Sequence, residues 1–290
     1  MNVLIVGSSG YIGTKLSQYL VQNQIQTSGV DLLPSKVDGI EHLQMDFLHL
    51  KENFLKDFTH IVLLAASSSV SACEDNRVES LTNNIVSLEA LLCKIHGNQT
   101  LIFASSGSVY DGVNSLEATE DFTLATPRNL YDLTKRMGEE LIKLSSKRSI
   151  VLRFGTVSGP SDNIRSDLVI NKMVKDAREK RFITVSNKHV NRAFLSIDDL
   201  CNWIEQIIKT DSSSPKMNIV NLSSFNSTMG NLGESVAAYF DVPIIEGQDG
   251  STYNFSMNSE KAERVFAYKA KDTVHDVIRK LDEYYSSLMN

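Results

Sequence analysis

Near its N-terminus the chain reads Val3-Leu4-Ile5-Val6-Gly7-Ser8-Ser9-Gly10-Tyr11-Ile12-Gly13, a short apolar run followed by three glycines. The apolar run is typical of a buried strand, and residues 11–21 place their apolar side chains at helical spacing. Glycines between a strand and a helix allow a tight turn, close approach of a pyrophosphate and close packing of the helix. Free N–H groups at the helix N-terminus favour the same anion. This segment predicts a dinucleotide-binding loop, with the spacing G-x-x-G-x-x-G.

Asp31 ends the second expected strand, residues 27–31, about 20 residues after the loop. A carboxylate at this place accepts a hydrogen bond from a ribose 2′-hydroxyl and repels a 2′-phosphate. Lys36 is the nearest cation that follows it. We therefore expect NAD, with NADP less favoured. The alternative is a tight loop followed by a solvated carboxylate, which leaves the ordered succession of strand, loop and helix unexplained.

Strand-like and helix-like segments alternate through the first half of the chain. Further strands are expected at 42–46, 61–66, 100–104 and 149–154, and helices from 73 or 74 to 94 and at 130–144. This alternation predicts parallel βαβ units, which right-handed crossovers join into a doubly wound α/β sheet of the Rossmann type. The remaining chain is expected to hold strands at 218–221 and 253–256 and helices at 166–180, 197–209, 228–240 and 272–286. We expect a dinucleotide-binding domain at 1–157, to which 191–222 returns, and a smaller C-terminal α/β substrate lobe at 158–290.

Composition limits the partners. The 290 residues include 29 Lys+Arg and 35 Asp+Glu, and this acidic balance argues against binding to nucleic acid. Cys73, Cys93 and Cys201 are scattered and form no metal-binding or disulfide pattern, which favours a reducing, cytoplasmic setting. No segment approaches the ~18 apolar residues of a membrane span. We expect a cytoplasmic protein with no metal, nucleic-acid or membrane partner.

Tyr131 and Lys135 stand one helical turn apart and so share a helix face. Oxidation of an alcohol needs an acceptor for the hydroxyl proton, and a nearby cation favours the tyrosine phenolate that can accept it. The pair also occurs by chance, but here it follows the fifth expected strand, whose carboxyl end faces the ligand crevice. Ser105, Ser106 and Ser108 leave that strand end, where a hydroxyl can orient a substrate oxygen. For Ser105 and Ser108, a turn that satisfies its own backbone is the simpler interpretation.

Together these motifs resemble the NAD-dependent epimerase/dehydratase family of extended short-chain dehydrogenase/reductases. The resemblance runs nearly end to end and includes Gly7-x-x-Gly10-x-x-Gly13, Ser105-Ser106-x-x-Val109-Tyr110, Tyr131-x-x-x-Lys135, Gly159-Pro160 and residues 192–199. It implies that Ser106, Tyr131 and Lys135 are catalytic.

The resemblance also implies the binding residues. The implied NAD site comprises Gly7, Gly10, Tyr11, Ile12, Gly13, Asp31, Leu32, Asp46, Phe47, Leu64, Ala65, Ala66, Asn84, Ala104, Tyr131, Lys135, Phe154 and Val157. The implied substrate is a nucleotide sugar, held by Ser67, Ser106, Ser108, Thr156 and Arg192, with Arg192 at the diphosphate. Family members often form homodimers through two helices, which correspond here to the helices near 74–94 and 130–146.

The chain departs from the family where the substrate is concerned. Gly107 and Ser108 stand where family dehydratases carry acidic residues, which disfavours a 4,6-dehydratase. Arg192 precedes Ala193 in place of the usual Asp, and no clear second arginine for a diphosphate is found before Tyr253.

The favoured function is therefore an NAD-dependent nucleotide-sugar epimerase that acts through a 4-keto intermediate. Tyr131 is its acid/base, and hydride passes to and from NAD. An NAD(P)H-dependent reductase of nucleotide 4-keto sugars is the first alternative, and only the preference of Asp31 for NAD speaks against it. A dinucleotide-binding sensor or scaffold without turnover is the second, and it is disfavoured because such proteins usually lack the Tyr or the Lys.

Overall fold

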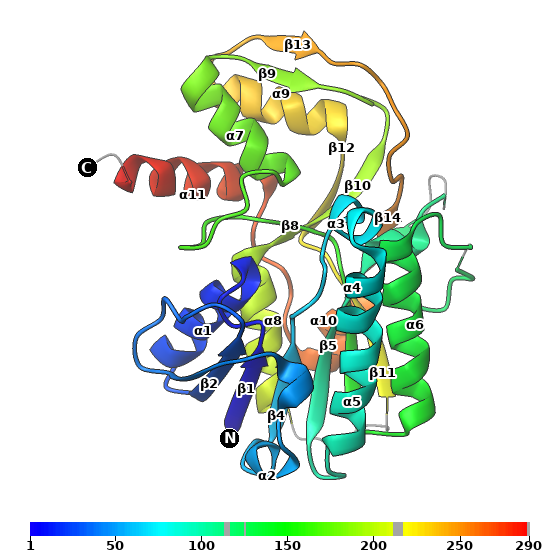
Figure 1. Ribbon diagram of the computed structural model, residues 1–290. Helices are drawn as coiled ribbons and strands as arrows, with labels where there is room; N and C mark the ends of the chain where they lie inside the picture. Colours follow the sequence, from blue (N-terminus) through cyan, green and yellow to red (C-terminus); the bar gives the residue numbers. More distant parts are fainter. Residues whose placement is uncertain (113–116, 125, 211–216, 289–290) are drawn as a thin grey trace.

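A computed structural model describes residues 1–112, 117–124, 126–210 and 217–288. Its centre is a parallel sheet with the strand order β11-β7-β5-β4-β1-β2-β3, seven strands in all (Figure 1). These strands are β1 (Asn2–Val6), β2 (Gln26–Asp31), β3 (Glu41–Gln44), β4 (His60–Leu63), β5 (Thr100–Ser106), β7 (Ser149–Phe154) and β11 (Met217–Leu222). The strand order reverses between β1 and β4, the place where doubly wound sheets open a ligand crevice. The α/β fold expected from the sequence is confirmed.

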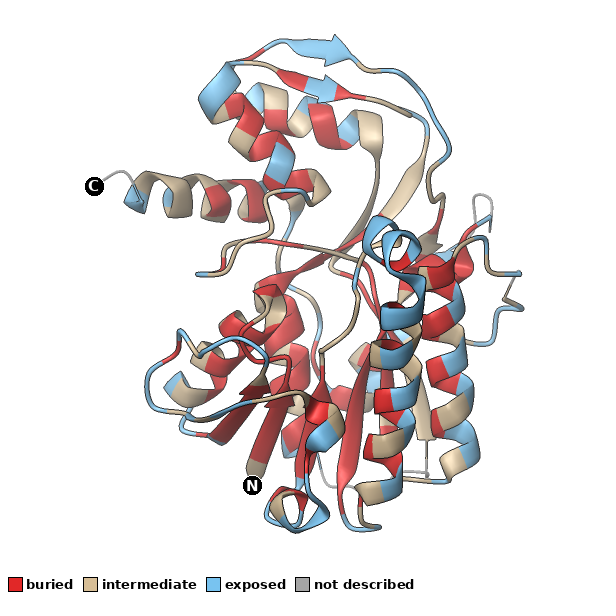
Figure 2. Ribbon diagram, viewed as in Figure 1, coloured by how far each residue is buried: buried red, intermediate tan, exposed pale blue. Residues whose placement is uncertain are grey.

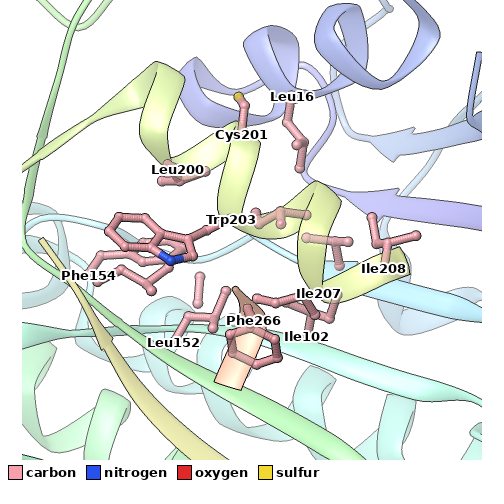
Figure 3. Close-up of a cluster of buried hydrophobic side chains, with 14 of the residues drawn as sticks. Leu16, Ile102, Leu152, Phe154, Leu200, Cys201, Trp203, Ile207, Ile208 and Phe266 are labelled. Carbon is pink, nitrogen blue, oxygen red and sulfur yellow. The ribbon is translucent and has the colours of Figure 1, made fainter. Parts of the chain in front are cut away.

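Helices cover both faces of this sheet. One face carries α1 (Tyr11–Gln22), α8 (Ile197–Lys209) and α10 (Glu260–Phe266), and the other carries α2 (Glu52–Leu55), α5 (Ser87–Lys94) and α6 (Leu130–Ser145). The inner strands β1, β4, β5 and β7 are buried along most of their length (Figure 2), which fits their mainly apolar sequences. On the first face Trp203 is fully buried and packs among Leu152, Phe154 and Phe266 (Figure 3).

The long helix expected from 73 or 74 to 94 is wrong, because the segment is interrupted. It consists of α3 (Val70–Asp75), α4 (Arg77–Leu81), the π-helical turn η2 (Thr82–Val86) and α5. Asn76 departs from helical geometry, with φ −129° and ψ 61°. In the π turn Asn84 points inward, accepts from Ser67 N at 2.8 Å and donates to Thr134 Oγ1 at 3.1 Å. The interruption therefore anchors the loop that follows β4.

Within the described residues, three smaller sheets and three further α-helices lie outside the elements named so far. The sheets contain β8 (Thr156–Ser158), β10 (Asn191–Ser196) and β12 (Phe225–Thr228), β9 (Ile183–Val185) and β13 (Ile244–Glu246), and β6 (Glu117–Ala118) and β14 (Ser256–Met257). The helices are α7 (Val169–Lys180), α9 (Met229–Phe240) and α11 (Val274–Ser287). The strand expected at 253–256 is wrong for 253–255, which form no strand. Three elements of the segment 158–290 belong to the central sheet or pack on it: β11, α8 and α10. The division of the chain into two lobes stays a prediction.

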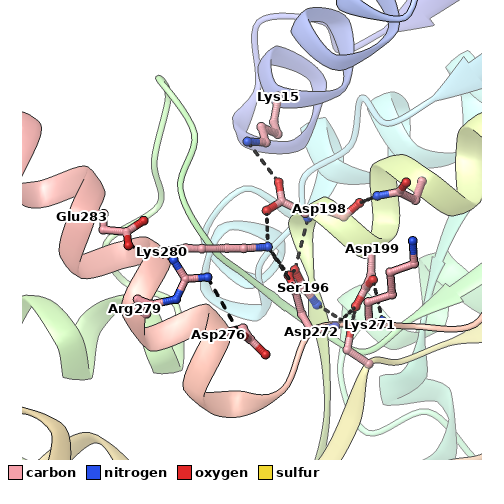
Figure 4. Close-up of polar contacts among 12 residues, drawn as sticks. Lys15, Ser196, Asp198, Asp199, Lys271, Asp272, Asp276, Arg279, Lys280 and Glu283 are labelled. Carbon is pink, nitrogen blue, oxygen red and sulfur yellow. Dashed lines mark hydrogen bonds and ion pairs between the residues drawn. The ribbon is translucent and has the colours of Figure 1, made fainter.

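A polar cluster beside α1 links this helix to α8 and α11. Ser196 caps α8 by accepting from Asp198 N. Asp198 pairs with Lys15 of α1 at 3.0 Å and with Lys280 of α11 at 2.7 Å (Figure 4). Helices from both ends of the chain are thereby held together.

Across the described residues no helix has the length and apolar character needed to cross a membrane.

Candidate active site

A cleft of about 520 Å³ lies at the carboxyl ends of the central strands. Nearly all the site residues predicted from the sequence line it. These are Gly7, Gly10, Tyr11, Ile12, Gly13, Asp31, Leu32, Asp46, Phe47, Leu64, Ala65, Ala66, Ala104, Ser106, Ser108, Tyr131, Lys135, Phe154, Thr156, Val157 and Arg192. Ser67 and Asn84 are the exceptions: they bond to each other beneath the loop, and the neighbouring Ala66 and Ser68 line the cleft. Asn84 therefore holds the loop that forms the cleft wall, and its contact with NAD stays a prediction.

The glycine loop is a cradle that admits no side chains. Gly7 has φ +94°, and a Cβ there would lie 2.6 Å from Ala65 N. A Cβ on Gly13 would lie 2.0 Å from Gly7 O. Gly10 is the N-cap of α1 and makes no side-chain cap hydrogen bond. The backbone can approach an anion closely here, which fits the pyrophosphate of NAD.

Asp31 is held at the end of β2, on the rim of this cradle. Its Oδ2 accepts from Ser9 N at 3.0 Å, and its Oδ1 accepts from Leu33 N at 3.0 Å. A carboxylate has about four lone-pair positions, so each oxygen can accept a further hydrogen bond. The residues present thus fit NAD, with Asp31 free to accept from ribose hydroxyls.

Tyr131 and Lys135 emerge from the first turns of α6, which Asn129 caps by accepting from Asp132 N. Lys135 Nζ donates to Ala104 O at 2.8 Å and lies 5.7 Å from the centre of the Tyr131 ring. Burial lowers the pKa of Lys135 to about 8, so its ammonium is still mostly protonated at neutral pH. Burial raises the pKa of Tyr131, and a hydrogen bond with Ser106 opposes that rise. The three side chains predicted to be catalytic therefore meet in one place.

Arg192 lies in the opposite wall, beneath two aromatic rings. Its guanidinium carbon is 5.2 Å from the Tyr253 ring centre and 5.9 Å from that of Phe255. Nη2 donates to Thr252 Oγ1 at 2.7 Å, whereas the buried Nε has no partner among the described residues. Desolvation lowers the pKa of Arg192, and an anionic ligand would offset that cost.

A second arginine of the cleft, Arg165, was not predicted from the sequence. Arg165 lines the cleft from the loop after Gly159-Pro160. Its Nη1 donates to Ser68 Oγ at 3.3 Å, and its Nη2 pairs with Asp167 at 2.5 Å. Tyr253 and Phe255 are also lining residues that were not predicted. No local signal marks these residues, since only the folded chain brings their loops to the cleft.

Comparison with known proteins supports the same interpretation. The model of the NAD dependent epimerase/dehydratase family matches residues 3–223. An uncharacterized protein of Methanocaldococcus jannaschii is 26% identical over 98% of this chain and 96% of its own. UDP-glucuronate 4-epimerase 2 of Arabidopsis thaliana is 26% identical over 98% of this chain and 76% of its own. The solved structure of UDP-glucuronic acid 4-epimerase from Bacillus cereus, in complex with UDP-glucuronic acid and NAD, has the same fold, with a TM-score of 0.87, 21% identity and coverage of 99% of this chain and 100% of that one.

The matched residues contain the glycine cradle, Asp31, Ser106, Tyr131 and Lys135. They extend over more than half of the chain, and they confirm the expectation of an NAD-dependent enzyme. The chain belongs to the NAD dependent epimerase/dehydratase family.

Proposed function

We propose that this protein is an NAD-dependent 4-epimerase of UDP-sugars that acts through a 4-keto intermediate. The observation that carries the proposal is the convergence of Ser106, Tyr131 and Lys135 in a cleft whose other end fits NAD. The choice of UDP-sugars is supported by the names of the relatives, which include UDP-glucuronate 4-epimerases.

The chemistry that NAD supplies, when bound, is reversible acceptance of a hydride. Tyr131, as phenolate, removes the proton from the sugar C4 hydroxyl while C4 loses its hydride. Tyr131 gives the proton back after the 4-keto sugar has turned its other face. The Lys135 ammonium, 5.7 Å from the ring centre, stabilises the phenolate against the cost of burial.

The diphosphate of the substrate is expected at the arginine end of the cleft. Arg192 offers a buried Nε that has no partner among the described residues, and Arg165 lines the same cleft. Two guanidinium groups match the two charges of a diphosphate, because each can donate in a fork to phosphate oxygens.

A reductase of 4-keto sugars remains the alternative, because it needs the same three side chains. A panel of UDP-sugars, including UDP-glucose and UDP-glucuronate, incubated with the protein and NAD distinguishes the two. An epimerase changes the C4 configuration, seen by NMR, without net NADH formation. A reductase consumes NADH stoichiometrically with 4-keto sugars. Binding of NAD with no conversion of any sugar would instead indicate a sensor or scaffold.

We infer a homodimer formed through residues 74–94 and 130–146. Helices of these segments leave large apolar side chains exposed, including Val78 at 79% and Leu144 at 78%. Burial of these side chains in a dimer would remove apolar surface from water. Light scattering of the purified protein gives the oligomeric state directly.

We also propose a cytoplasmic location, with which the free cysteines are consistent.

A further inference from the structure

Asp132 is a buried carboxyl group that the proposed reaction does not use. It follows Tyr131 on α6 and is 2% exposed. Its Oδ1 accepts from Ser108 Oγ at 2.6 Å and from the Tyr253 hydroxyl at 3.0 Å, and its Oδ2 accepts from Asn129 Nδ2 at 2.7 Å. Ser108 and Tyr253 line the cleft, so one carboxyl group lies directly behind two hydroxyl groups of the cleft wall.

The contacts of Asp132 fit its ionised form. All three partners donate to it, and a carboxylate accepts but does not donate. Burial raises the pKa of Asp132, and the hydrogen bonds from Ser108, Tyr253 and Asn129 oppose that rise. Asp132 is therefore a carboxylate that holds its two hydroxyl neighbours by their protons.

These two hydroxyl groups cannot donate to a ligand while Asp132 holds their protons. Asn129 Nδ2 donates to the Tyr253 oxygen at 2.8 Å, so the Tyr253 proton points to Asp132. Ser108 Oγ accepts from Ser106 Oγ at 2.9 Å, which leaves one of its two lone pairs open. The Asp132 wall, formed by Ser108 and Tyr253 with Asp132 behind them, therefore presents a hydrogen-bond acceptor and a negative charge to the cleft.

The sugar of the substrate has to pass the Asp132 wall. In the proposed function its C4 hydroxyl meets Tyr131, and the diphosphate on C1 meets Arg192. The Tyr253 ring centre lies 5.2 Å from the guanidinium carbon of Arg192, and the Tyr253 hydroxyl reaches Asp132, the residue after Tyr131. The wall thus runs between the positions of C1 and C4.

Epimerisation brings both edges of the sugar to this wall. The ring turns about the line from C1 to C4 to offer its other face for hydride return, and this turn exchanges the C2–C3 edge with the C5 edge. Whichever edge faces the wall before the turn, the C5 substituent faces it in one of the two orientations. The group on C5 therefore meets the Asp132 wall in every catalytic cycle.

From this geometry we infer that Asp132 is a specificity-determining residue, which selects UDP-sugars with a neutral group on C5 against UDP-uronates. The inference rests on the proposed function. A hydroxymethyl group on C5, as in UDP-glucose, can donate to the open lone pair of Ser108. A carboxylate there, as in UDP-glucuronate, only accepts, and it finds no free proton on either hydroxyl of the wall. One hydrogen-bond length beyond Ser108 it would also lie about 5 Å from Asp132 Oδ1, where two buried negative charges repel strongly.

The cations of the cleft are engaged elsewhere. Among the described residues these are Lys135, Arg165 and Arg192. Lys135 lies beside the Tyr131 ring, and the two arginines are assigned to the diphosphate. Within the described chain none of the hydrogen-bond partners of Asp132 is a cation, so no bonded counter-ion neutralises its charge. Asp132 acts on the substrate through Ser108 and is a positioning residue in that sense.

The substitution Asp132→Asn removes the charge and reverses the polarity of the wall. Asn129 Nδ2 needs an acceptor where Oδ2 now lies, so the new amide turns its oxygen there and its NH₂ towards Ser108 and Tyr253. The two hydroxyl oxygens then accept from the amide, and their protons are free to point into the cleft. A structural defect alone would lower the use of every sugar, whereas this change favours a carboxylate.

The kinetic test compares UDP-glucose with UDP-glucuronate in the NAD-loaded protein. We expect wild-type kcat/KM to be about 10²-fold higher for UDP-glucose. Asp132→Asn should bring the two values within about fivefold of each other, because kcat/KM for UDP-glucuronate rises while that for UDP-glucose falls. Ser108→Ala, which removes a hydroxyl but keeps the charge, should weaken the use of UDP-glucose without improving that of UDP-glucuronate. Equal or better use of UDP-glucuronate by the wild type, or an unchanged ratio in Asp132→Asn, would overturn the inference.

Asp111→Asn is the matched control. Asp111 is also buried, at 7% exposed. Burial and, to a lesser degree, the Asp111 charge raise the Asp132 pKa, so the two carboxylates feel the same region of the protein. The partners of Asp111 are Arg128 and the backbone N of Asn254, and the ratio of the two kcat/KM values should therefore stay within about twofold of wild type. An equal shift of the ratio in both variants would overturn the specific role of Asp132.

The second readout needs no turnover. Calorimetric titration of the NAD-loaded protein with UDP-glucose and with UDP-glucuronate gives the Kd of each, and the same preference and its loss in Asp132→Asn should appear there. This pattern without conversion of either sugar would keep the selection by Asp132 and overturn the epimerase. Epimerisation of UDP-glucuronate, bound more tightly than UDP-glucose, would keep the epimerase and overturn the selection. Failure of both UDP-sugars to bind would overturn both.

Discussion

The two ends of the cleft are built in opposite ways. The end beside β1 and α1 is made of backbone, and a Cβ on Gly13 would collide with Gly7 O. The end beside β5 and α6 is made of side chains, among which Tyr131 and Lys135 meet residues from distant loops. We therefore expect the first end to be sensitive to an added atom and the second to a removed one. The difference follows from their ligands, because phosphate binding needs close N–H groups whereas proton transfer needs side chains.

Removal of one oxygen from the side-chain end should have the largest effect. Tyr131→Phe is expected to lower kcat about 10³-fold, because it deletes the proton acceptor. The affinity for NAD, measured by calorimetry, should stay within about twofold, since Phe keeps the ring. If NAD affinity fell by as large a factor as kcat, the two ends of the cleft would not act independently.

Addition of one carbon to the backbone end is the converse test. Gly13→Ala is expected to weaken NAD binding about 10²-fold and to lower Tm, because the clash is with backbone and cannot be relieved by a rotamer change. Gly97→Ala is the control, since a Cβ there meets nothing within 4 Å. Equal NAD affinities of the two variants, measured by calorimetry, would contradict the cradle.

Raising the pH removes the positive charge of Lys135 at the side-chain end of the cleft. Lys135 has a pKa near 8, so its ammonium is present below that pH and is lost as pH rises through it. We expect kcat/KM to fall by up to about tenfold per pH unit above about pH 8, as the phenolate loses its cation. Lys135→Arg should be less active at pH 7 but should lack this descending limb, because arginine stays charged. A limb at the same pH in both proteins would assign it to another group.

The smallest effect is expected where one side chain contributes to the backbone end. Asp31→Asn should weaken NAD binding about tenfold, the loss of one charged hydrogen bond, and should raise the relative affinity for NADP. Asp38→Asn, an exposed neighbour, should change neither affinity. Calorimetric titration with both dinucleotides checks this, and an unchanged NADP to NAD ratio would argue against contact of Asp31 with the ribose.

Local patterns predicted the backbone end well. The apolar run at 3–6, the glycine spacing and Asp31 lie within one βαβ unit, so their neighbours in space are also neighbours in sequence. The Tyr131 and Lys135 pair was equally visible, because one helical turn sets its geometry. The interrupted helix at 70–94 was not predicted, because its π turn depends on bonds from Asn84 to Ser67 and Thr134.

The amino-acid order alone predicted the separate strands, the glycine loop and the facing phenol and ammonium, because each depends on contacts within a strand, a turn or a helix. Tertiary structure decided the rest: that Arg165 and Tyr253 line the cleft, and that Asp132 accepts hydrogen bonds from the hydroxyl groups of Ser108 and Tyr253. These residues come from segments far apart in the chain. Their meeting depends on how layers pack, which is a sum of many weak burial terms and leaves no local pattern.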